Sequence, residues 1–176
     1  IIDSANGFLY YRHIFNKGSC GTSSTVGTVF ANSFYVNAVC VSPCGTGVNS
    51  VVPIYISESP IAGVTGPSET CTQTTVLFSD TSTSGNAIDQ TTSPVSCGAG
   101  TKGVWKIFPS SYSLISGTLG SVPSQVYIDD LANWSTGSSS INVQFNNAGT
   151  YTIRRIIGLT SSSNASCTID STDITI

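Results

Sequence analysis

His13 is the only histidine in the chain, and no catalytic motif surrounds it. A histidine that acts as a general base needs a nucleophile and an orienting carboxylate within reach. His13 lies in an alternating segment, so we interpret it as an ordinary strand or surface histidine. The sequence offers no catalytic residue, and we expect that the chain is not an enzyme.

Asp129 and Asp130 are the closest pair of carboxylates, and they follow an apolar run. Paired carboxylates serve as acid and base in glycosidases, and carboxylate oxygens are the ligands that Ca²⁺ prefers. Neighbouring residues on a strand point to opposite faces, which disfavours both roles. We therefore expect a polar turn here, keep calcium only as a weak candidate, and expect no other cofactor.

The two tryptophans differ in their surroundings. Trp105 lies in an apolar strand-like run, which predicts a core position, whereas Trp134 lies in a loop-like segment. An exposed aromatic ring is a stacking surface for a ligand such as a surface polysaccharide. Trp134 is therefore the candidate ligand contact, although local packing is the favoured interpretation because one aromatic residue is weak support for a site.

The six cysteines form an even set in a chain rich in Ser and Thr; they are Cys20, Cys40, Cys44, Cys71, Cys97 and Cys167. This favours disulfides in an oxidising compartment. The spacing of Cys40 and Cys44 resembles half of a zinc site, but no second close pair follows, so we expect no metal centre of this kind.

Composition narrows the class of protein. Only 9% of the 176 residues are charged, the net charge is −3, and six residues are basic. No basic patch is available for nucleic acid, and no apolar run is long enough to cross a membrane. A surface of hydroxyls and amides suits a secreted or cell-surface protein. The absence of an initiator Met predicts a processed or partial polypeptide.

Short β-branched and aromatic runs, separated by Gly, Asn, Pro and Ser, predict an all-β fold of antiparallel sandwiches. A Pro-containing stretch at residues 57–67 predicts a boundary, so we divide the chain into modules 1–59 and 60–176. The expected strands are Phe8–Phe15, Thr25–Phe30, Ser33–Val41, Ser50–Ile56, Thr74–Asp80, Gly103–Phe108, Gln125–Asp129, Ser140–Phe145, Thr150–Leu159 and Thr168–Ile176.

Tyr151 stands at the start of an alternating strand, directly after Gly149 and Thr150. This position predicts a tyrosine corner, in which the phenol hydroxyl donates to the backbone a few residues upstream.

A family resemblance rests on four segments of the second module: VLFSDTS (76–82), VWKIFPSS (104–111), INVQFNNAGTYTIRRI (141–156) and CTIDSTDITI (167–176). Together they resemble the polycystic-kidney-disease (PKD) domain, in the version common in secreted Bacteroidetes proteins. The FPSS segment departs from the Gly-Asp-Gly of the better-known PKD domains. The resemblance implies a PKD-like sandwich over most of residues 67–176.

The first module resembles a bacterial Ig-like repeat in YYR (10–12), GSCGT (18–22), VGT (26–28) and SFYVNA (33–38). In that family two further strands precede the aromatic strand. The resemblance therefore implies a partial module, whose missing strands are either absent from a fragment or supplied by another chain or segment through strand addition.

Together the resemblances imply tandem Ig-like and PKD-like repeats in a stalk or filament of a bacterial surface adhesin, of the gliding-motility type exported by the type IX system. The expected partners are neighbouring repeat modules or chains. Two alternatives remain: a non-catalytic carbohydrate-binding accessory module of a secreted enzyme, and a fibre subunit assembled by strand donation.

The same resemblance points to O-glycosylation at Ser4 and Ser171, which follow Asp in the Bacteroidetes pattern. Asn133 and Asn164 match the N-glycosylation sequon.

The topology of a sandwich also predicts a pairing for the cysteines. Cys97 and Cys167 fall at the same end of a sandwich, which predicts a bridge between them, and Cys40 and Cys44 flank a hairpin turn. Cys20 pairs either with a cysteine on a missing strand or with the remaining residue, Cys71.

Overall fold

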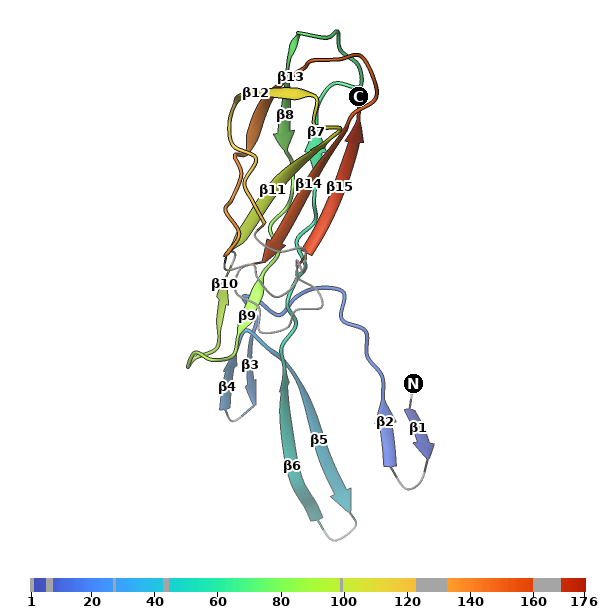
Figure 1. Cartoon of the computed structure of the whole chain (residues 1–176). Helices are drawn as coiled ribbons and strands as arrows, with labels where there is room; N and C mark the ends of the chain where they lie inside the picture. Colours follow the sequence, from blue (N-terminus) through green and yellow to red (C-terminus); the bar gives the residue numbers. More distant parts are fainter. Residues whose placement is uncertain are drawn as a thin grey trace.

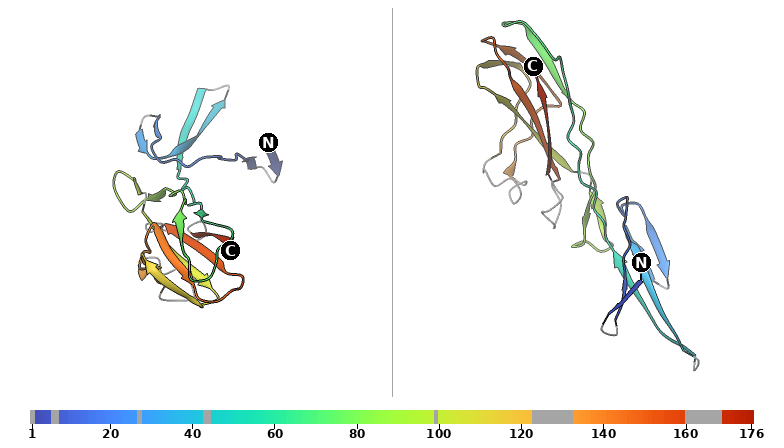
Figure 2. Two further views of the ribbon diagram at one scale, coloured as in Figure 1. Left: turned by 90° about the horizontal axis from the view of Figure 1, so that it is seen from above. Right: turned by 90° about the vertical axis from the view of Figure 1, so that its right-hand side faces the viewer.

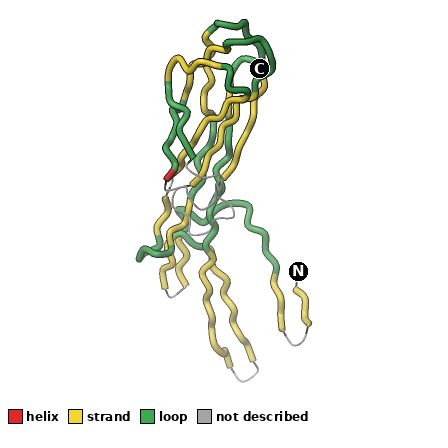
Figure 3. The backbone as a smooth tube through the Cα atoms, in the orientation of Figure 1, coloured by secondary structure: helices red, strands yellow, loops and turns green. Residues whose placement is uncertain are grey.

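The computed structural model describes residues 2–5, 8–26, 28–42, 45–98, 100–122, 133–159 and 169–176. Strands joined by loops and turns make up nearly all of this part, with almost no helix, which confirms the all-β prediction (Figure 3). The molecule is elongated: a sandwich occupies one end and separate hairpins project from the other (Figures 1 and 2).

The sandwich consists of two antiparallel sheets. One sheet has the order β11-β14-β15, and its strands are Thr101–Phe108, Thr152–Leu159 and Ile169–Thr175. The other has the order β12-β13-β8-β7, and its strands are Tyr112–Ser116, Ser140–Phe145, Thr75–Asp80 and Val64–Thr65.

Alternating apolar residues build the main core between these sheets. The buried cluster contains one or more side chains from β8, β11, β13 and β14: Phe78, Trp105, Ile107, Ile141, Val143, Phe145, Tyr151 and Ile153. The prediction of a buried Trp105 is confirmed, since this residue is 2% exposed and its indole nitrogen donates to the carbonyl of Ser138 (2.8 Å).

The tyrosine corner is confirmed as well. The hydroxyl of Tyr151, which is 3% exposed, lies 3.0 Å from the carbonyl oxygens of Ser111 and Asn147. This contact fastens the start of β14 to the loop before it and to the segment that precedes β12.

Replacement of Tyr151 by Phe tests this corner. Loss of the hydroxyl leaves two carbonyls without this donor, so we expect a loss of about 1–3 kcal/mol in the free energy of unfolding. Urea denaturation measures it. Tyr35→Phe is the control, because Tyr35 is 42% exposed and surface changes usually stay within about 0.5 kcal/mol. Equal effects of the two changes would contradict the corner's contribution.

Hairpins form the remainder of the described strands. They are β1–β2 (Ile2–Ala5, Phe8–Tyr11), β3–β4 (Ser23–Val26, Thr28–Ala31), β5–β6 (Phe34–Ser42, Gly45–Ile54) and β9–β10 (Ala87–Asp89, Ser96–Gly98).

Several expected strand limits need correction. The single strand expected over Thr25–Phe30 is instead two strands, β3 and β4. They form a hairpin in which Val26 lies opposite Thr28. The strand expected to reach Phe15 ends at Tyr11. Strands β1, β7, β9, β10 and β12 were not predicted from the sequence. The strand expected at residues 125–129 lies outside the described residues.

The predicted boundary at residues 57–67 is held by backbone pairing rather than by a free linker. Glu58 pairs with Asn86, and Ile61 pairs with Thr83, each through antiparallel bridges. Gly85 lies so close to the backbone of residues 58–60 that a Cβ atom would collide with it. The division into modules 1–59 and 60–176 stays a prediction.

Candidate functional site

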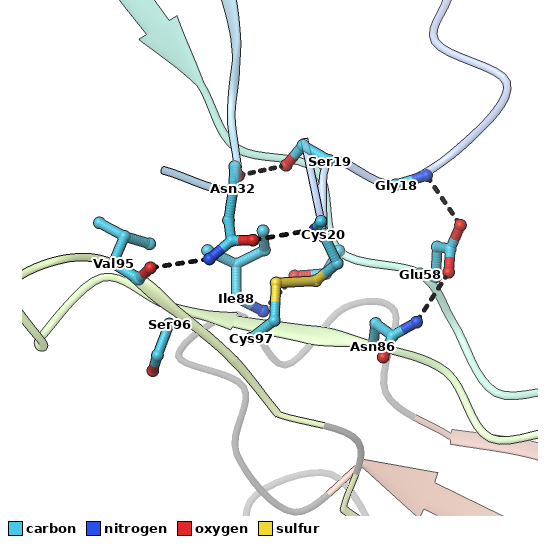
Figure 4. The surroundings of a disulfide bond; sticks show 12 residues. Gly18, Ser19, Cys20, Asn32, Glu58, Asn86, Ile88, Val95, Ser96 and Cys97 are labelled. Atoms are coloured by element: carbon cyan, nitrogen blue, oxygen red, sulfur yellow. Dashed lines mark hydrogen bonds between the residues drawn. A yellow bond between two sulfur atoms is a disulfide. The ribbon is translucent and has the colours of Figure 1, made fainter. Parts of the chain in front are cut away.

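We call the hairpins β1–β6 the first block, and the β9–β10 hairpin with the sandwich the second block. A disulfide between Cys20 and Cys97 lies where the two blocks meet (Figure 4). Cys20 belongs to the segment between β2 and β3, and Cys97 lies on β10, so the bond joins residues 77 positions apart, with their Cα atoms at 5.8 Å. A disulfide of this kind indicates an oxidising, extracellular-type environment.

Ser19, next to the disulfide, is fully buried and ties three segments together. Its hydroxyl donates to the carbonyl of Asn32 (2.7 Å) and accepts from the amide of Ile56 (2.9 Å). Its own amide donates to the carbonyl of Ile56 (2.9 Å). Ser19 therefore holds the Cys20 segment against the turn before β5 and against the chain that leaves β6.

Asn32 extends this network to the β9–β10 hairpin. Its φ angle of 54° is left-handed, a conformation that Asn tolerates better than most residues. Its side-chain oxygen accepts from the amide of Gly21 (2.9 Å), and its side-chain nitrogen donates to the carbonyl of Val95 (2.8 Å). The contact with Val95 spans the same gap as the disulfide (Figure 4).

Glu58 closes the opposite side of the junction. Its carboxylate accepts from the amide of Gly18 (2.9 Å) and from the side-chain nitrogen of Asn86 (3.1 Å). The hydrogen bond from the Gly18 amide, and then that from Asn86, hold the pKa of this carboxyl below its ordinary value, against a smaller effect of burial. The carboxylate is therefore an acceptor that bridges the two blocks at neutral pH.

These groups form a joint, which we call the Cys20–Cys97 junction: Gly18, Ser19, Cys20, Asn32, Ile56, Glu58, Asn86, Val95 and Cys97. Its polar groups bond to one another across the junction. The disulfide and these hydrogen bonds together connect the segment around Cys20 with Glu58 and with the β9–β10 hairpin.

The pairing of the cysteines corrects the sequence prediction. Because Cys97 is bonded to Cys20, the bridges expected between Cys97 and Cys167 and between Cys20 and Cys71 are wrong. Cys97 was expected in a loop at the end of the sandwich, whereas it lies on a hairpin that extends toward the first block (Figure 1). Cys71 is exposed and carries a free thiol.

Several other candidates stay predictions. Cys44, Cys167, Asp129, Asp130 and Asn164 lie outside the described residues. Cys40 lies on β5. Because Cys44, Asp129 and Asp130 are not described, the Cys40–Cys44 bridge and the calcium candidates stay untested. No cluster of three or more potential metal-ligating side chains occurs in the part of the chain that the structure describes.

The favoured interpretation of Trp134, local packing, is confirmed, and the alternative of a ligand contact is wrong. Trp134 is 3% exposed and packs with Val104 and Ile156 on the outer face of the β11–β14–β15 sheet. Val104 and Ile156 form a small apolar patch there, and the ring covers this patch instead of facing solvent. The ring is thus unavailable as a stacking surface for a ligand.

The potential glycosylation sites lie on different elements. Ser4 is on β1, Ser171 is on β15 and exposed, and Asn133 is exposed beside Trp134. Their modification stays a prediction. His13 contacts Phe15 edge-on, with 4.7 Å between the ring centroids.

The roles of Ser19, Asn32 and Glu58 were not predicted from the sequence. A weak signal existed for Asn32, since Asn between two strand-like runs favours a turn with positive φ. No local signal identifies Val95 as its partner, because the two residues are 63 positions apart.

No family model, curated protein or solved structure matches this chain. Within the described residues, no helix is long and apolar enough to span a membrane.

Proposed function

We propose that the chain is a structural segment of an extracellular stalk or filament, in which Ig-like and PKD-like β modules are joined end to end at the Cys20–Cys97 junction. The observation that carries this proposal is the junction itself. A covalent bond and hydrogen bonds from Ser19, Asn32 and Glu58 connect the two blocks of an elongated molecule.

This arrangement resists bending and pulling. The disulfide cannot part under forces that separate hydrogen bonds, and the bridges at Glu58 and Ile61 prevent the boundary segment from acting as a free linker. In a bacterial surface adhesin such as a gliding-motility protein exported by the type IX system, a stiff spacer of this kind would project an adhesive end from the cell. Such a segment has no enzymatic activity.

The carbohydrate-binding alternative loses its main support, because Trp134 is buried. A panel of surface polysaccharides separates the two functions. A spacer binds none of them, whereas tight, saturable binding by the whole chain would contradict a purely structural role.

Stretching single molecules by their two ends tests the mechanical role. The disulfide joins residues 77 positions apart, and the chain between them cannot extend while the bond is intact. At about 3.6 Å per extended residue, reduction should lengthen the fully stretched chain by about 270 Å. The same measurement on Cys71→Ser, whose thiol is free, should match the wild type. An equal extension before and after reduction would remove the support for a covalently closed junction.

A further inference from the structure

Two covalent routes lead from Cys20 into the sandwich. In the first, which we call the disulfide route, Cys20 is bonded to Cys97 on β10, and β11 is the next strand along the chain. In the second, the chain route, the polypeptide passes through the hairpins β3–β4 and β5–β6 and enters the sandwich at β7. The two routes therefore reach different sheets, because β11 and β7 belong to different sheets (Figure 1).

The chain route contains slack. The amide of Ser19 donates to the carbonyl of Ile56, and the amide of Ile56 donates to the hydroxyl of Ser19, at 2.9 Å each. The residues between them fold back on themselves in the two hairpins. Once tension breaks these hydrogen bonds, the hairpins must unfold before the chain route becomes taut. The disulfide has no such slack, so it carries the tension that reaches Cys20.

The disulfide route loads the β11–β14–β15 sheet along its strands. Thr101 and Ile169, the first residues of β11 and β15, both pair with the last residues of β14, at the end of the sheet nearer the junction. Tension that enters at Thr101 leaves at the opposite end of the sheet, where β15 finishes. Ladder hydrogen bonds lie across the strands. The eight residue pairs of β11 with β14, and the seven of β14 with β15, therefore share the tension.

The chain route ends on a much weaker attachment. β7 pairs with β8 through two residues, Val64 and Thr65, and the isolated bridges at Glu58 and Ile61 precede it. Their partners on β8 are its last residues, so Thr75, the first residue of β8, lies at the far end of the strand. Once β7 is free, tension pulls Thr75 back along its own strand. β8 then parts from β13 one residue pair at a time.

We propose that the Cys20–Cys97 disulfide directs tension into β11 and shields β7 and β8 from it, so that the three-stranded sheet is the load-bearing element of this chain. The inference rests on the proposed stalk function, because tension acts on a spacer between two attached ends. It gives the disulfide a role beyond stability: the bond selects which strands bear the load.

Stretching single molecules by their two ends measures the force at which the sandwich begins to break. Cys20→Ser combined with Cys97→Ser, the serine pair, leaves only the chain route. Two residue pairs rather than eight then resist together. Because forced unfolding follows the unfolding barrier, we expect the serine pair to begin breaking at about half the wild-type force or less. Reduction of the folded wild type by a small thiol, which can reach the exposed Cys97, gives the same comparison without a substitution.

Two matched changes of glycine to alanine locate the loaded strands. A Cβ atom at Gly63, next to β7, would lie 2.8 Å from the carbonyl oxygen of Thr81, and one at Gly103, on β11, would collide with the guanidinium of Arg155. In the wild type, Gly103→Ala should lower the breaking force and Gly63→Ala should leave it unchanged. In the serine pair, Gly63→Ala should lower the force at which breaking begins.

Near-ultraviolet circular dichroism of the buried Trp105 reports whether each variant keeps the sandwich. Equal breaking forces for the wild type and the serine pair would overturn the inference, and so would an equal effect of Gly63→Ala in both. Those results would leave the stalk function standing. Polysaccharide binding by the chain would contradict the stalk function instead, while a difference in force between the wild type and the serine pair would still establish the route of tension.

Discussion

Replacement of Asp80 by Ala should destabilise the sandwich by about 3–5 kcal/mol, because it leaves the guanidinium of Arg155 buried without its ion-pair partner. Asp80 lies at the end of β8 and Arg155 lies on β14, so the ion pair connects the two sheets. The Arg155 side chain is 4% exposed and that of Asp80 is 16% exposed.

The surroundings of Arg155 explain why the pair matters so much. Its guanidinium lies over the ring of Trp105, 4.8 Å from the centroid, and packs against Gly103, where a Cβ atom would collide with it. Its Nε and Nη1 atoms are buried and have no hydrogen-bond partner among the described residues. Asp80 therefore supplies the compensating charge.

Urea denaturation, followed through Trp105, measures this effect. Asp173→Ala is the matched control, because Asp173 forms an ion pair with the neighbouring Arg154 (2.7 Å) while both side chains are exposed by 38–44%. Exposed pairs contribute about 0–1 kcal/mol. Asp80→Ala combined with Arg155→Met should recover part of the loss, since no buried charge remains. Similar losses for the Asp80 and Asp173 variants would contradict the argument.

The same pair predicts a dependence on pH. Burial raises the pKa of Asp80. Hydrogen bonds from Ser82, and then the hydrogen bond and the positive charge of Arg155, together outweigh burial and hold the pKa of Asp80 below its ordinary value. A carboxyl whose pKa is lower in the folded state stabilises the protein fully above its unfolded-state pKa. This stabilisation is lost as the pH falls through the lower, folded-state pKa. In Asp80→Ala, the acid-dependent loss of stability should be smaller.

The sandwich was predictable because its signals are local. Trp105 lies in an alternating strand and Tyr151 directly precedes one, and alternation places one face of each strand in the core. The tyrosine corner needs a turn and a strand that are adjacent in sequence, and its hydroxyl bonds Asn147, four residues upstream. Patterns within about ten residues carry such information directly.

The junction was not predictable for the opposite reason. The partner of Cys20 lies 77 residues away, on a three-residue strand with no apolar periodicity. Assigning Cys97 to the end of the sandwich assumed that residues 87–98 stay with it, whereas they form a hairpin that reaches the first block. Local packing of Trp134 was the favoured interpretation, but its partners Val104 and Ile156 were not predictable, because they depend on tertiary packing.

Replacement of both Cys20 and Cys97 by Ser should lower the free energy of unfolding by about 4.5 kcal/mol, the chain-entropy contribution expected when a disulfide joins residues 77 positions apart. The stability of the sandwich, as well as that of the junction, should fall. The loop from residue 20 to residue 97 includes β7 and β8, and β8 pairs with β13 in the middle of a sheet. Without the disulfide, the unfolded chain between residues 20 and 97 gains conformational entropy. Folding of the sandwich must overcome this entropy, because the central strand β8 lies within that stretch.

Urea denaturation with two probes separates these contributions: the circular dichroism of Trp105 for the sandwich, and hydrogen exchange of the Ile56 and Asn86 amides for the junction. We expect both probes to respond to Cys20→Ser with Cys97→Ser, and neither to respond to Cys71→Ser, because the Cys71 thiol is exposed and free. If only the junction amides lost protection, the disulfide would stabilise the joint alone, and the two blocks would unfold independently. A response at Trp105 would instead establish that the covalent link and the central strand β8 couple the two blocks into one cooperative unit, which is the property that a stiff spacer requires.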